Sequence, residues 1–480
     1  MSTTYFDVTD LVQYAKGHNR VSGIQRVQWR ILSELAHGDQ GDRVRLCFHS
    51  SERGQHLSIP ARAVFTHRRA EFHGGRFLRT LGEIQSGLMP PRYEVKRLLK
   101  PYEDRKWLRG VLKGQLYLTA LLQPERLLAR GVEEWRDSKT PPVAATQAQP
   151  LSLKAQDKLV LLGAYWDQPA VIQLAQAHRR AEGDVVMLVH DVIPDAAPAL
   201  CTDGQVRLFR QRMHIFPQVA NRFMAVSHYT ARDFVKAMLG AVRLEDVQVV
   251  PLAHEFGDLP RRTVMDLSEV TDVPSGQRQV LCVGTIEARK NQVLLLRVWQ
   301  ALLARFGEQT PELVLCGKYG SKTEAFKRLL AQDPALQAKV RILPAPTDAE
   351  LAQCYEQAWF TVFPSLYEGW GLPVGEAAWL GKVCLASNAS SVPEVLGQAA
   401  PCLPPDDPET WSQFIGLLIT TPHLLALWTQ QVLHAPLRDW TLVAADMHAA
   451  IQASEAHSRR SAQTAPPAHA IAWSSPILAA

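Results

Sequence analysis

Two glutamates, Glu368 and Glu376, lie in the stretch YEGWGLPVGE with seven residues between them. Three glycines and a proline make this stretch unsuitable for one continuous helix or strand, so it predicts a loop that leads into another element. Two carboxylates on such a loop could act as a general acid and base, or could accept hydrogen bonds from the hydroxyl groups of a ligand.

A second loop carries two adjacent cations. It begins at Gly284, after the apolar run RQVLCV, and it places Arg289 and Lys290 just before a segment with helical spacing that we expect Asn291 to cap. Backbone amides and the dipole at a helix N-terminus attract anions, and the two cations would add charge-assisted hydrogen bonds to a diphosphate. The alternative is a solvated pair of surface cations.

The loop after Glu368 contains a helix-start signal. Pro373 suits a first helical turn, and we expect Glu376 in the same turn, where the dipole favours a carboxylate by roughly 0.3–1 kcal/mol without any function. Glu368 precedes the helix and has no such structural reason. The loop around Asn388, SNASS (387–391), offers small polar groups and free amides to a ligand, or simply caps the next helix.

Polar residues also follow strands in the N-terminal half. His190 and Asp191 come directly after the apolar run VVMLV, and Ser22 and Gly23 open the helix that follows the first strand. A single histidine at a strand end is more often structural than catalytic. These residues gain weight only if the fold brings them to the same edge as the C-terminal loops.

The elements that would position these loops alternate along the chain. Short β-branched runs separated by helical patterns indicate parallel sheets covered by helices, in which ligands bind outside the carboxyl ends of the strands. Thr347 with Glu350, and Ser391 with Glu394, fit the capping box and predict helix starts. The predicted strands span 44–48, 159–164, 185–190, 222–227, 247–252, 278–284, 313–316, 340–343, 360–363 and 383–387.

A chain of 480 residues predicts more than one domain. We expect an N-terminal domain over 1–255 with a basic, helix-rich insertion near 66–157, a linker at 256–277, and a C-terminal domain over 278–436. Residues 457–480 have the composition of a disordered tail.

Composition narrows the class of protein. With 46% hydrophobic and 21% charged residues, the chain is typical of a soluble globular protein. No secretory signal and no apolar run of about 18–20 residues is found, so we expect a cytoplasmic protein. Between residues 62 and 113, 13 lysines and arginines stand against 5 acidic residues, which suits a phosphate-bearing acceptor, contact with the inner membrane surface, or a solvated helix face. No zinc or RNA-binding motif accompanies them, which argues against nucleic acid.

Taken together, the motifs resemble a known family. VGTIEARKN (283–291), SLYEGWGLPVGEA (365–377), ASNASSVPEV (386–395), HDVIP (190–194) and AVSHYT (225–230) resemble the retaining glycosyltransferases of family 4, also called glycosyl transferases group 1. DVTDLVQY and SGIQRV near the N-terminus further resemble the bacterial polysaccharide-assembly type. The resemblance implies an α/β GT-B fold, with two Rossmann-like, doubly wound parallel-sheet domains facing a central cleft. It also implies that residues 437–456 form a closing helix that crosses back to the N-terminal domain.

The resemblance assigns roles to the motif residues. Glu368 would contact the donor sugar, Glu376 would accept hydrogen bonds from the ribose, and Arg289 and Lys290 would neutralise the leaving pyrophosphate. His190 would approach the transferred sugar, so the implied catalytic residues are Glu368, His190 and Lys290. The implied donor-binding residues are Gly284, Thr285, Arg289, Lys290, Gly371, Leu372, Pro373, Val374, Glu376 and Asn388, and the implied acceptor or cleft residues are Ser22, Gly23 and Asp191.

The implied reaction moves a sugar, with mannose from GDP-mannose as the leading donor, to a cell-envelope polysaccharide or a lipid-linked oligosaccharide. No Asp-x-Asp motif for a divalent ion is found, so we expect a metal-independent hexosyltransferase without a cofactor; Asp406 and Asp407 are the nearest acidic pair. Two alternatives are a GT-B phosphorylase and a sugar-nucleotide epimerase. Relatives often carry a bulkier residue at the position of Gly375.

Overall fold

The computed structural model describes residues 2–18, 20–21, 23–69, 71–83, 107, 110–114 and 148–453. Ser22, much of the basic segment 62–113, most of the expected insertion and the expected tail at 457–480 lie outside the described residues.

The N-terminal domain is built on an eight-stranded sheet with the order β4-β3-β2-β1-β5-β6-β7-β8. Neighbours from β2 to β8 pair in parallel, whereas β3 and β4 add an antiparallel edge. The strands are β1 (Thr4–Asp7), β2 (Val44–Ser50), β3 (Gln55–Pro60), β4 (Gln149–Pro150), β5 (Lys158–Leu161), β6 (Asp184–Val189), β7 (Arg222–Ala225) and β8 (Val247–Val249).

The C-terminal domain contains a wholly parallel six-stranded sheet with the order β11-β10-β9-β12-β13-β14. This is the doubly wound order, in which the winding direction reverses between the first and fourth strands. The strands are β9 (Gln279–Val283), β10 (Glu312–Cys316), β11 (Val340–Leu343), β12 (Phe360–Phe363), β13 (Cys384–Ser387) and β14 (Cys402–Leu403).

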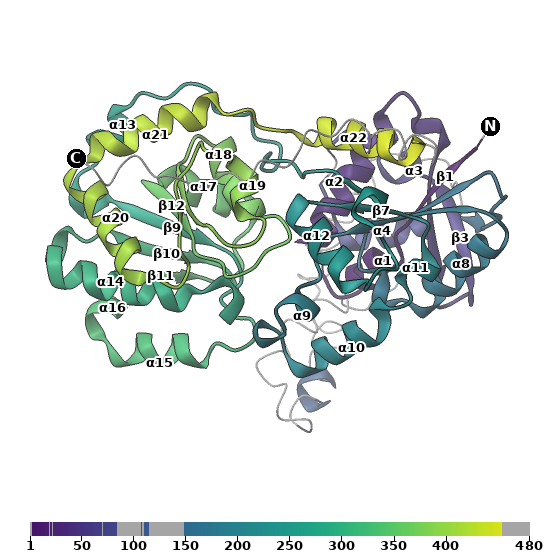
Figure 1. Ribbon diagram of the computed structural model, residues 1–480, viewed down its shortest axis with the longest axis horizontal. Helices are drawn as coiled ribbons and strands as arrows, with labels where there is room; N and C mark the ends of the chain where they lie inside the picture. Colours follow the sequence, from purple (N-terminus) through teal and green to yellow (C-terminus); the bar gives the residue numbers. More distant parts are fainter. Residues whose placement is uncertain are drawn as a thin grey trace.

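Helices cover both sheets, and the molecule has two lobes joined by crossing segments (Figure 1). The expectation of two doubly wound α/β domains is therefore confirmed, and each predicted strand matches an observed one to within a few residues; β3, β4 and β14 were not predicted, and no range was predicted for β1. The N-terminal helices are α1 (Thr9–Ala15), α2 (Ile24–His37), α3 (Ala61–Val64), α4 (Gly74–Leu81), α8 (Pro169–Arg180), α9 (Ile193–Ala196), α10 (Asp203–Met213), α11 (Phe216–Val219) and α12 (His228–Ala237). The helices that follow are α13 (Ser268–Thr271), α14 (Gln292–Phe306), α15 (Glu324–Gln332), α16 (Pro334–Lys339), α17 (Asp348–Gln357), α18 (Leu372–Trp379), α19 (Val392–Leu396), α20 (Pro408–Thr420), α21 (Pro422–His434) and α22 (Trp440–Gln452).

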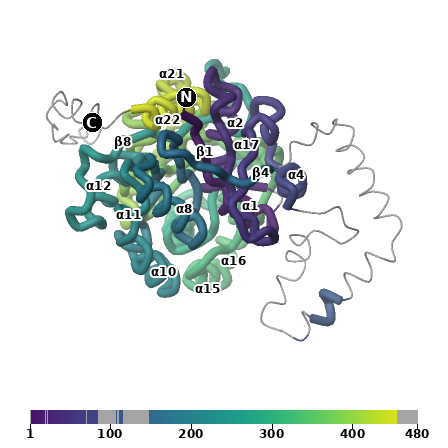
Figure 2. The backbone as a smooth tube through the Cα atoms, turned by 90° about the vertical axis from the view of Figure 1, so that its right-hand side faces the viewer, coloured from purple at the N-terminus to yellow at the C-terminus, as the bar shows by residue number. Residues whose placement is uncertain are grey.

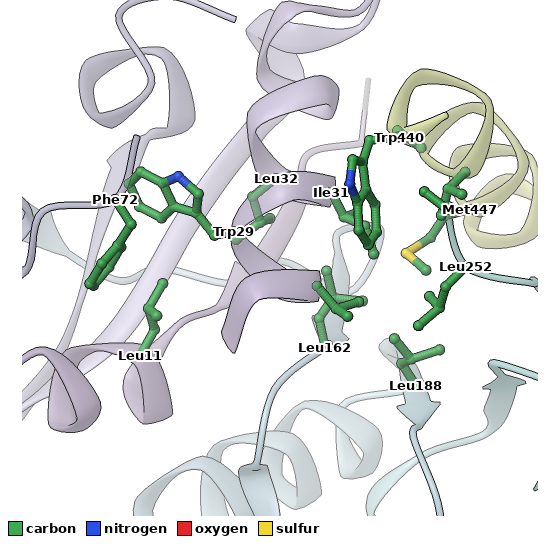
Figure 3. Packing of buried hydrophobic residues seen from close by; sticks show 14 of the residues in the cluster. Leu11, Trp29, Ile31, Leu32, Phe72, Leu162, Leu188, Leu252, Trp440 and Met447 are labelled. Carbon is green, nitrogen blue, oxygen red and sulfur yellow. The ribbon is translucent and has the colours of Figure 1, made fainter. Parts of the chain in front are cut away.

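The first described part of the expected insertion belongs to the N-terminal core. The ring of Trp29 on α2 lies 4.9 Å from that of Phe72 and 5.7 Å from that of Phe77 on α4, and all three side chains are buried. Figure 3 shows Trp29 and Phe72 side by side above Leu11 of α1. Aromatic packing therefore anchors residues 72–81 to α2.

Helix α22 lies on the N-terminal domain although it follows the C-terminal one. Its Trp440 and Met447 are buried and point toward Ile31 of α2 (Figure 3). Arg222 and Lys158 of the N-terminal sheet donate to backbone carbonyls at its C-terminal end, at 3.1 Å to Ala450 and 2.9 Å to Ile451. Figure 2, which faces the N-terminal domain, shows α22 and α2 at the same edge. Apolar burial and two cations at the negative end of its dipole thus hold α22 in place.

The segment 256–277 contacts the C-terminal domain along its length. Met265 and Val270 are buried in the C-terminal core, and Arg261 donates to the carbonyl of Leu433 at 2.9 Å. Residues near 255 and 437 are where the chain passes between the domains. There the backbone amide of His254 donates to the carbonyl of Arg438 at 2.9 Å, and the backbone amide of Arg438 donates to Nδ1 of the His254 ring at 2.8 Å. The two crossings are therefore tied to each other.

All seven cysteines are free, and four of them are buried. None of the helices in the described ranges has the length and apolarity required to cross a bilayer.

Candidate functional site

The candidate site lies where the winding of the C-terminal sheet reverses, between β9 and β12. The loop after β9 carries Arg289 and Lys290, and the loop after β12 carries Glu368. The two loops are bonded directly, because the backbone amide of Leu366 donates to the carbonyl of Arg289 at 2.8 Å. This edge is the place where open α/β sheets bind ligands.

Glu368 forms ion pairs with both cations of the neighbouring loop. Its Oε2 lies 2.7 Å from Nη1 of Arg289, and its Oε1 lies 2.5 Å from Nζ of Lys290. The hydroxyl of Ser365 donates to Oε1 at 2.6 Å, and Arg289 also pairs with Glu287 at 3.0 Å. The sequence separates these residues by almost 80 positions, and the fold joins them in one buried cluster.

The cluster is electrically balanced before any ligand binds. Burial alone would raise the pKa of Glu368, but Lys290 and Arg289 outweigh burial and hold this pKa at about 2. Burial lowers the pKa of Lys290, and the charge of Glu368 opposes that shift. Two cations therefore face Glu368 and Glu287, so a diphosphate that approached Arg289 and Lys290 would compete with carboxylates already paired to them.

Serine hydroxyls from the loop after β13 hold the Glu368 loop in place. Ser391 donates to the carbonyls of Glu368 at 2.8 Å and Trp370 at 3.0 Å, and Ser387 donates to the carbonyl of Ser365 at 2.6 Å. Ser390 accepts from the amide of Glu368 at 2.8 Å. These hydroxyls were expected to face a ligand or to cap a helix, and instead they fix the backbone of the neighbouring loop.

The helix starts predicted after Ser391 and Asn291 are confirmed, but the side-chain caps predicted there are wrong. Ser391 does not cap α19, and Glu394 does not reach back to it, because the Ser391 hydroxyl is engaged by the Glu368 loop and the Glu394 carboxylate binds α12 of the other domain. Asn291 does not cap α14, because its side-chain amide donates to the carbonyls of Pro364 and Pro405. The capping box of Thr347 with Glu350 at the start of α17 is confirmed.

Helices α14 and α18 begin at the site without a side-chain cap. Helix α18 starts at Leu372 and continues through Pro373 and Val374, and its N-cap is Gly371 with φ 127°, a conformation that favours glycine. Gly284, at the end of β9, has φ 144°. The amides of Leu294 and Val374 donate to the backbone carbonyls of Asn291 and Gly371, but no side chain occupies the first amides of either helix, which is the arrangement expected for phosphate binding.

Glu376 lies in the second turn of α18, so its predicted place in the first turn is wrong. The helix begins at Leu372, one residue before Pro373, and this moves the carboxylate beyond the reach of the free amides. It contacts side chains instead: Oε1 lies 3.1 Å from Nη1 of Arg26, and the hydroxyl of Tyr355 donates to Oε2 at 3.2 Å. Burial raises the pKa of Glu376, and the charge of Arg26 opposes the rise.

His190 reaches the C-terminal loop from the other domain. Its Nε2 lies 2.6 Å from the carbonyl oxygen of Leu162, which can only accept, so Nε2 carries a proton. Burial lowers its pKa to about 4. The backbone of His190 touches Gly369, where an added Cβ would stand 1.9 Å from the His190 carbonyl oxygen. Burial also raises the pKa of Asp191, which is partly buried beside this contact.

The remaining predicted site residues lie at three places. Gly23, with φ 55°, precedes α2 in the N-terminal domain. Thr285 lies in the loop after β9, where its carbonyl accepts a hydrogen bond from the side chain of Gln292 at 3.0 Å. Asn388 is exposed at the carboxyl end of β13, and its backbone amide donates to the carbonyl of Leu403. Within the described ranges, His, Cys, Asp and Glu side chains form no group of three or more that could hold a metal ion.

Sequence reasoning missed the partners that hold the two glutamates. Arg26 and Tyr355 hold Glu376, and Ser365 holds Glu368. Ser365 is the only one of these in the same loop as its partner, so its spacing of three residues was a usable signal. Arg26 is 350 positions from Glu376, and no local pattern links them.

Residues 265–432 match the family described as Glycosyl transferases group 1. The chain is 28% identical over 231 residues to O-antigen chain mannosyltransferase B of Escherichia coli, a match that covers 48% of this chain and 60% of that protein. It is 31% identical over 223 residues to the E. coli serotype-specific mannosyltransferase WbdA, covering 44% of this chain and 26% of that protein. The chain thus spans less than two thirds of these relatives.

The fold is similar to that of Anabaena Alr3699/HepE, solved in complex with UDP. The TM-score is 0.54 at 14% identity, and the match covers 94% of this chain and 99% of that protein. Both lobes and their arrangement therefore match a known two-domain α/β structure, which places the chain in the GT-B fold.

Proposed function

We propose that this protein is a retaining glycosyltransferase that moves a sugar, with mannose from GDP-mannose as the leading donor, to an envelope polysaccharide or a lipid-linked oligosaccharide. The observation that carries the proposal is the buried cluster of Glu368, Arg289 and Lys290 beside two uncapped helix starts. The match of residues 265–432 to the family and the two mannosyltransferase relatives support it.

In the proposed reaction, the bond between the anomeric carbon and the phosphate oxygen breaks, and negative charge develops on the leaving diphosphate. Arg289 and Lys290, with the amides at the start of α18, stabilise that charge in a site of low polarity. Glu368, which its low pKa keeps ionised, accepts hydrogen bonds from sugar hydroxyls. Glu376 accepts from the ribose hydroxyls.

His190 and Asp191 would line the sugar site from the N-terminal domain. The neutral His190 ring keeps its proton on Nε2 for Leu162, so it can position the sugar but is not a strong general acid. We propose that the acceptor attacks from the face that the diphosphate leaves, and that the departing phosphate oxygen takes the acceptor proton. Glu368 then need not form a covalent bond to the sugar.

The reaction is proposed to proceed without a metal, since the two cations can supply the positive charge. Retention predicts that the new linkage keeps the anomeric configuration of the donor sugar, which proton NMR of the product would show. Activity that is unchanged by a chelator would agree with metal independence, and loss that added divalent ions restore would contradict it. A phosphorylase or an epimerase finds no specific support in the described site.

The basic segment 62–113 is proposed to contact the inner membrane surface that carries a lipid-linked acceptor. Half of it, including the stretch 84–106, lies outside the described residues, so the proposal rests on charge alone. Neutralising Arg97, Lys100, Arg105 and Lys106 together should release the protein from vesicles that contain anionic lipid. Unchanged vesicle binding would contradict the contact.

A thermal-shift screen against GDP-, UDP-, dTDP- and ADP-sugars tests the central proposal. A ligand that binds only the folded protein raises its melting temperature. At a ligand concentration of a hundred times the Kd, the added stability is about 2.7 kcal/mol. Lys290→Ala should abolish the shift, whereas Lys339→Ala, which removes a partly exposed cation paired with Glu308 away from the site, should keep it. Absence of a shift with every donor would argue strongly against the proposed function.

A further inference from the structure

Arg26 links the two domains through two carboxylates of the C-terminal domain. It is the third residue of α2, and its Nη1 lies 3.1 Å from Oε1 of Glu376 on α18. Its Nη2 lies 3.0 Å from Oδ1 of Asp348, the first residue of α17. One guanidinium from the N-terminal domain therefore spans two helices of the other domain.

The three side chains differ in burial, and this difference identifies the important pair. The side chain of Glu376 is 5% exposed and that of Arg26 is 20% exposed, whereas that of Asp348 is 53% exposed. A carboxylate that is removed from water needs a cation or several donors, so Glu376 depends on its partners more than Asp348 does. Arg26 and the hydroxyl of Tyr355 each bind one oxygen of Glu376, and together they fix the plane of the carboxylate.

This pairing exists only while the two domains are together. Tyr355 and Glu376 both belong to the C-terminal domain, so their hydrogen bond survives a separation of the domains. The bond from Arg26 does not, because α2 moves with the N-terminal domain. A separated Glu376 would keep one fixed oxygen and lose the donor on the other.

We propose that Arg26 is a positioning residue for the nucleotide, and that it holds the carboxylate of Glu376 in one orientation from the opposite domain. The nucleotide then finds its ribose acceptor complete only when the domains are together. This inference rests on the proposed function, in which Glu376 accepts hydrogen bonds from the ribose. It extends that function by placing a determinant of nucleotide affinity in the N-terminal domain.

The test measures the affinities of GDP, UDP, dTDP and ADP by calorimetry for the full chain and its variants. Arg26→Gln should weaken binding of the best nucleotide by about tenfold or more, because the buried carboxylate loses its charged partner. Arg26→Lys should recover part of the loss, since an ammonium group can still pair with Oε1 of Glu376. In a Glu376→Gln background, Arg26→Gln should have little further effect, because the partner through which Arg26 acts is gone.

Arg30→Gln is the matched control. It removes an arginine from the same helix and breaks a single ion pair, 2.7 Å to Asp258, so binding should equal that of the wild type. Wild-type affinity in Arg26→Gln, or equal losses in Arg26→Gln and Arg30→Gln, would overturn the inference and leave the proposed function standing. If the wild type binds none of the four nucleotides, the proposed function fails and the inference fails with it.

Discussion

Glu394 of the C-terminal domain caps a helix of the N-terminal domain: its carboxylate accepts hydrogen bonds from the backbone amides of His228 and Tyr229, both at 2.7 Å. These amides begin α12, where the helix dipole favours a negative charge. Figure 1 shows α12 on the side of the N-terminal domain that faces α19. In the same turn, the hydroxyl of Thr230 donates to the carbonyl of Gly369 at 3.1 Å, so the start of α12 binds both α19 and the Glu368 loop.

Glu394→Ala should therefore loosen the contact between the domains. Loss of a charged cap costs roughly 1–2 kcal/mol, which lowers the ratio of closed to open molecules by about 5- to 30-fold. Small-angle X-ray scattering should show a larger radius of gyration for the variant. Glu409→Ala removes an exposed glutamate from the first turn of α20, away from the interface, and should leave the radius unchanged. An unchanged radius in Glu394→Ala would contradict a closing role for this cap.

Glu368→Gln should destabilise the protein most at neutral pH. The variant leaves the largely buried Arg289 and Lys290 without their main counter-charge, which costs roughly 3–5 kcal/mol. The folded-state pKa of Glu368, about 2, lies below its ordinary value of 4.5, so its stabilisation is complete above about pH 5 and is lost as the pH falls toward 2.

Denaturant unfolding of the wild type and Glu368→Gln between pH 7 and pH 3 would measure this effect. The difference in unfolding free energy should stay constant from pH 7 to about pH 5 and should then shrink as the pH falls to about 3. A difference that stays constant across this range would mean that the charge of Glu368 does not stabilise the cluster. Glu409→Gln, at an exposed carboxylate, supplies the baseline.

Asp7→Asn should have the opposite dependence on pH. Asp7 ends β1 and is buried, and burial raises its pKa from 3.8 to about 7. Its stabilisation is complete below pH 3.8, where the side chain is protonated in both states, and it is lost as the pH rises through 7, by up to about 4 kcal/mol. An asparagine can still accept from the amide of Thr9, which Asp7 now bonds at 3.1 Å.

Melting temperatures from pH 4 to pH 8 would test this prediction. The melting temperature of the variant relative to that of the wild type should increase as the pH rises, and the variant should be the more stable protein at pH 8. A variant that is less stable at every pH would show that the asparagine cannot replace the hydrogen bonds of the acid.

The alternation of apolar runs and helical patterns was enough to predict both sheets, because each buried strand must be locally apolar. The closeness of Glu368 to Arg289 and Lys290 was also predictable, since each residue follows a strand and the carboxyl ends of parallel strands share an edge. What these side chains do to one another was not predictable. Glu368 and the two cations form ion pairs, whereas the sequence suggested separate roles for them.

Local sequence patterns did not predict the contacts between the domains. Glu394 fits a capping box by spacing, yet it caps α12, because the first turn of a distant helix offers it two amides that its own helix cannot match. Arg26 pairs with Glu376 across 350 positions, because the fold brings a buried carboxylate within reach of its guanidinium. A capping rule considers only the next three residues. Helices α19 and α14 do begin after Ser391 and Asn291, but tertiary contacts take these two side chains away from the cap.

Gly369→Ala should separate the domains without removing any charge. The new Cβ would stand 1.9 Å from the carbonyl oxygen of His190 and 3.1 Å from the Cβ of Asp191, so the backbones of the two domains must move apart. The hydrogen bond from Thr230 to the carbonyl of Gly369 would then lengthen or break. We expect a larger radius of gyration and, if the proposed function holds, at least a tenfold loss of transfer activity, because a displacement of about 1 Å at a reacting site can cost a hundredfold.

Gly204→Ala is the matched control for this substitution. Gly204 is the second residue of α10, and an added Cβ there meets nothing within 4 Å. It should therefore keep the wild-type radius and gain up to about 1 kcal/mol of stability, since alanine loses less conformational entropy than glycine in a helix. A wild-type radius in both variants would mean that the loops of His190 and Gly369 can part locally, and that this contact does not set the distance between the domains.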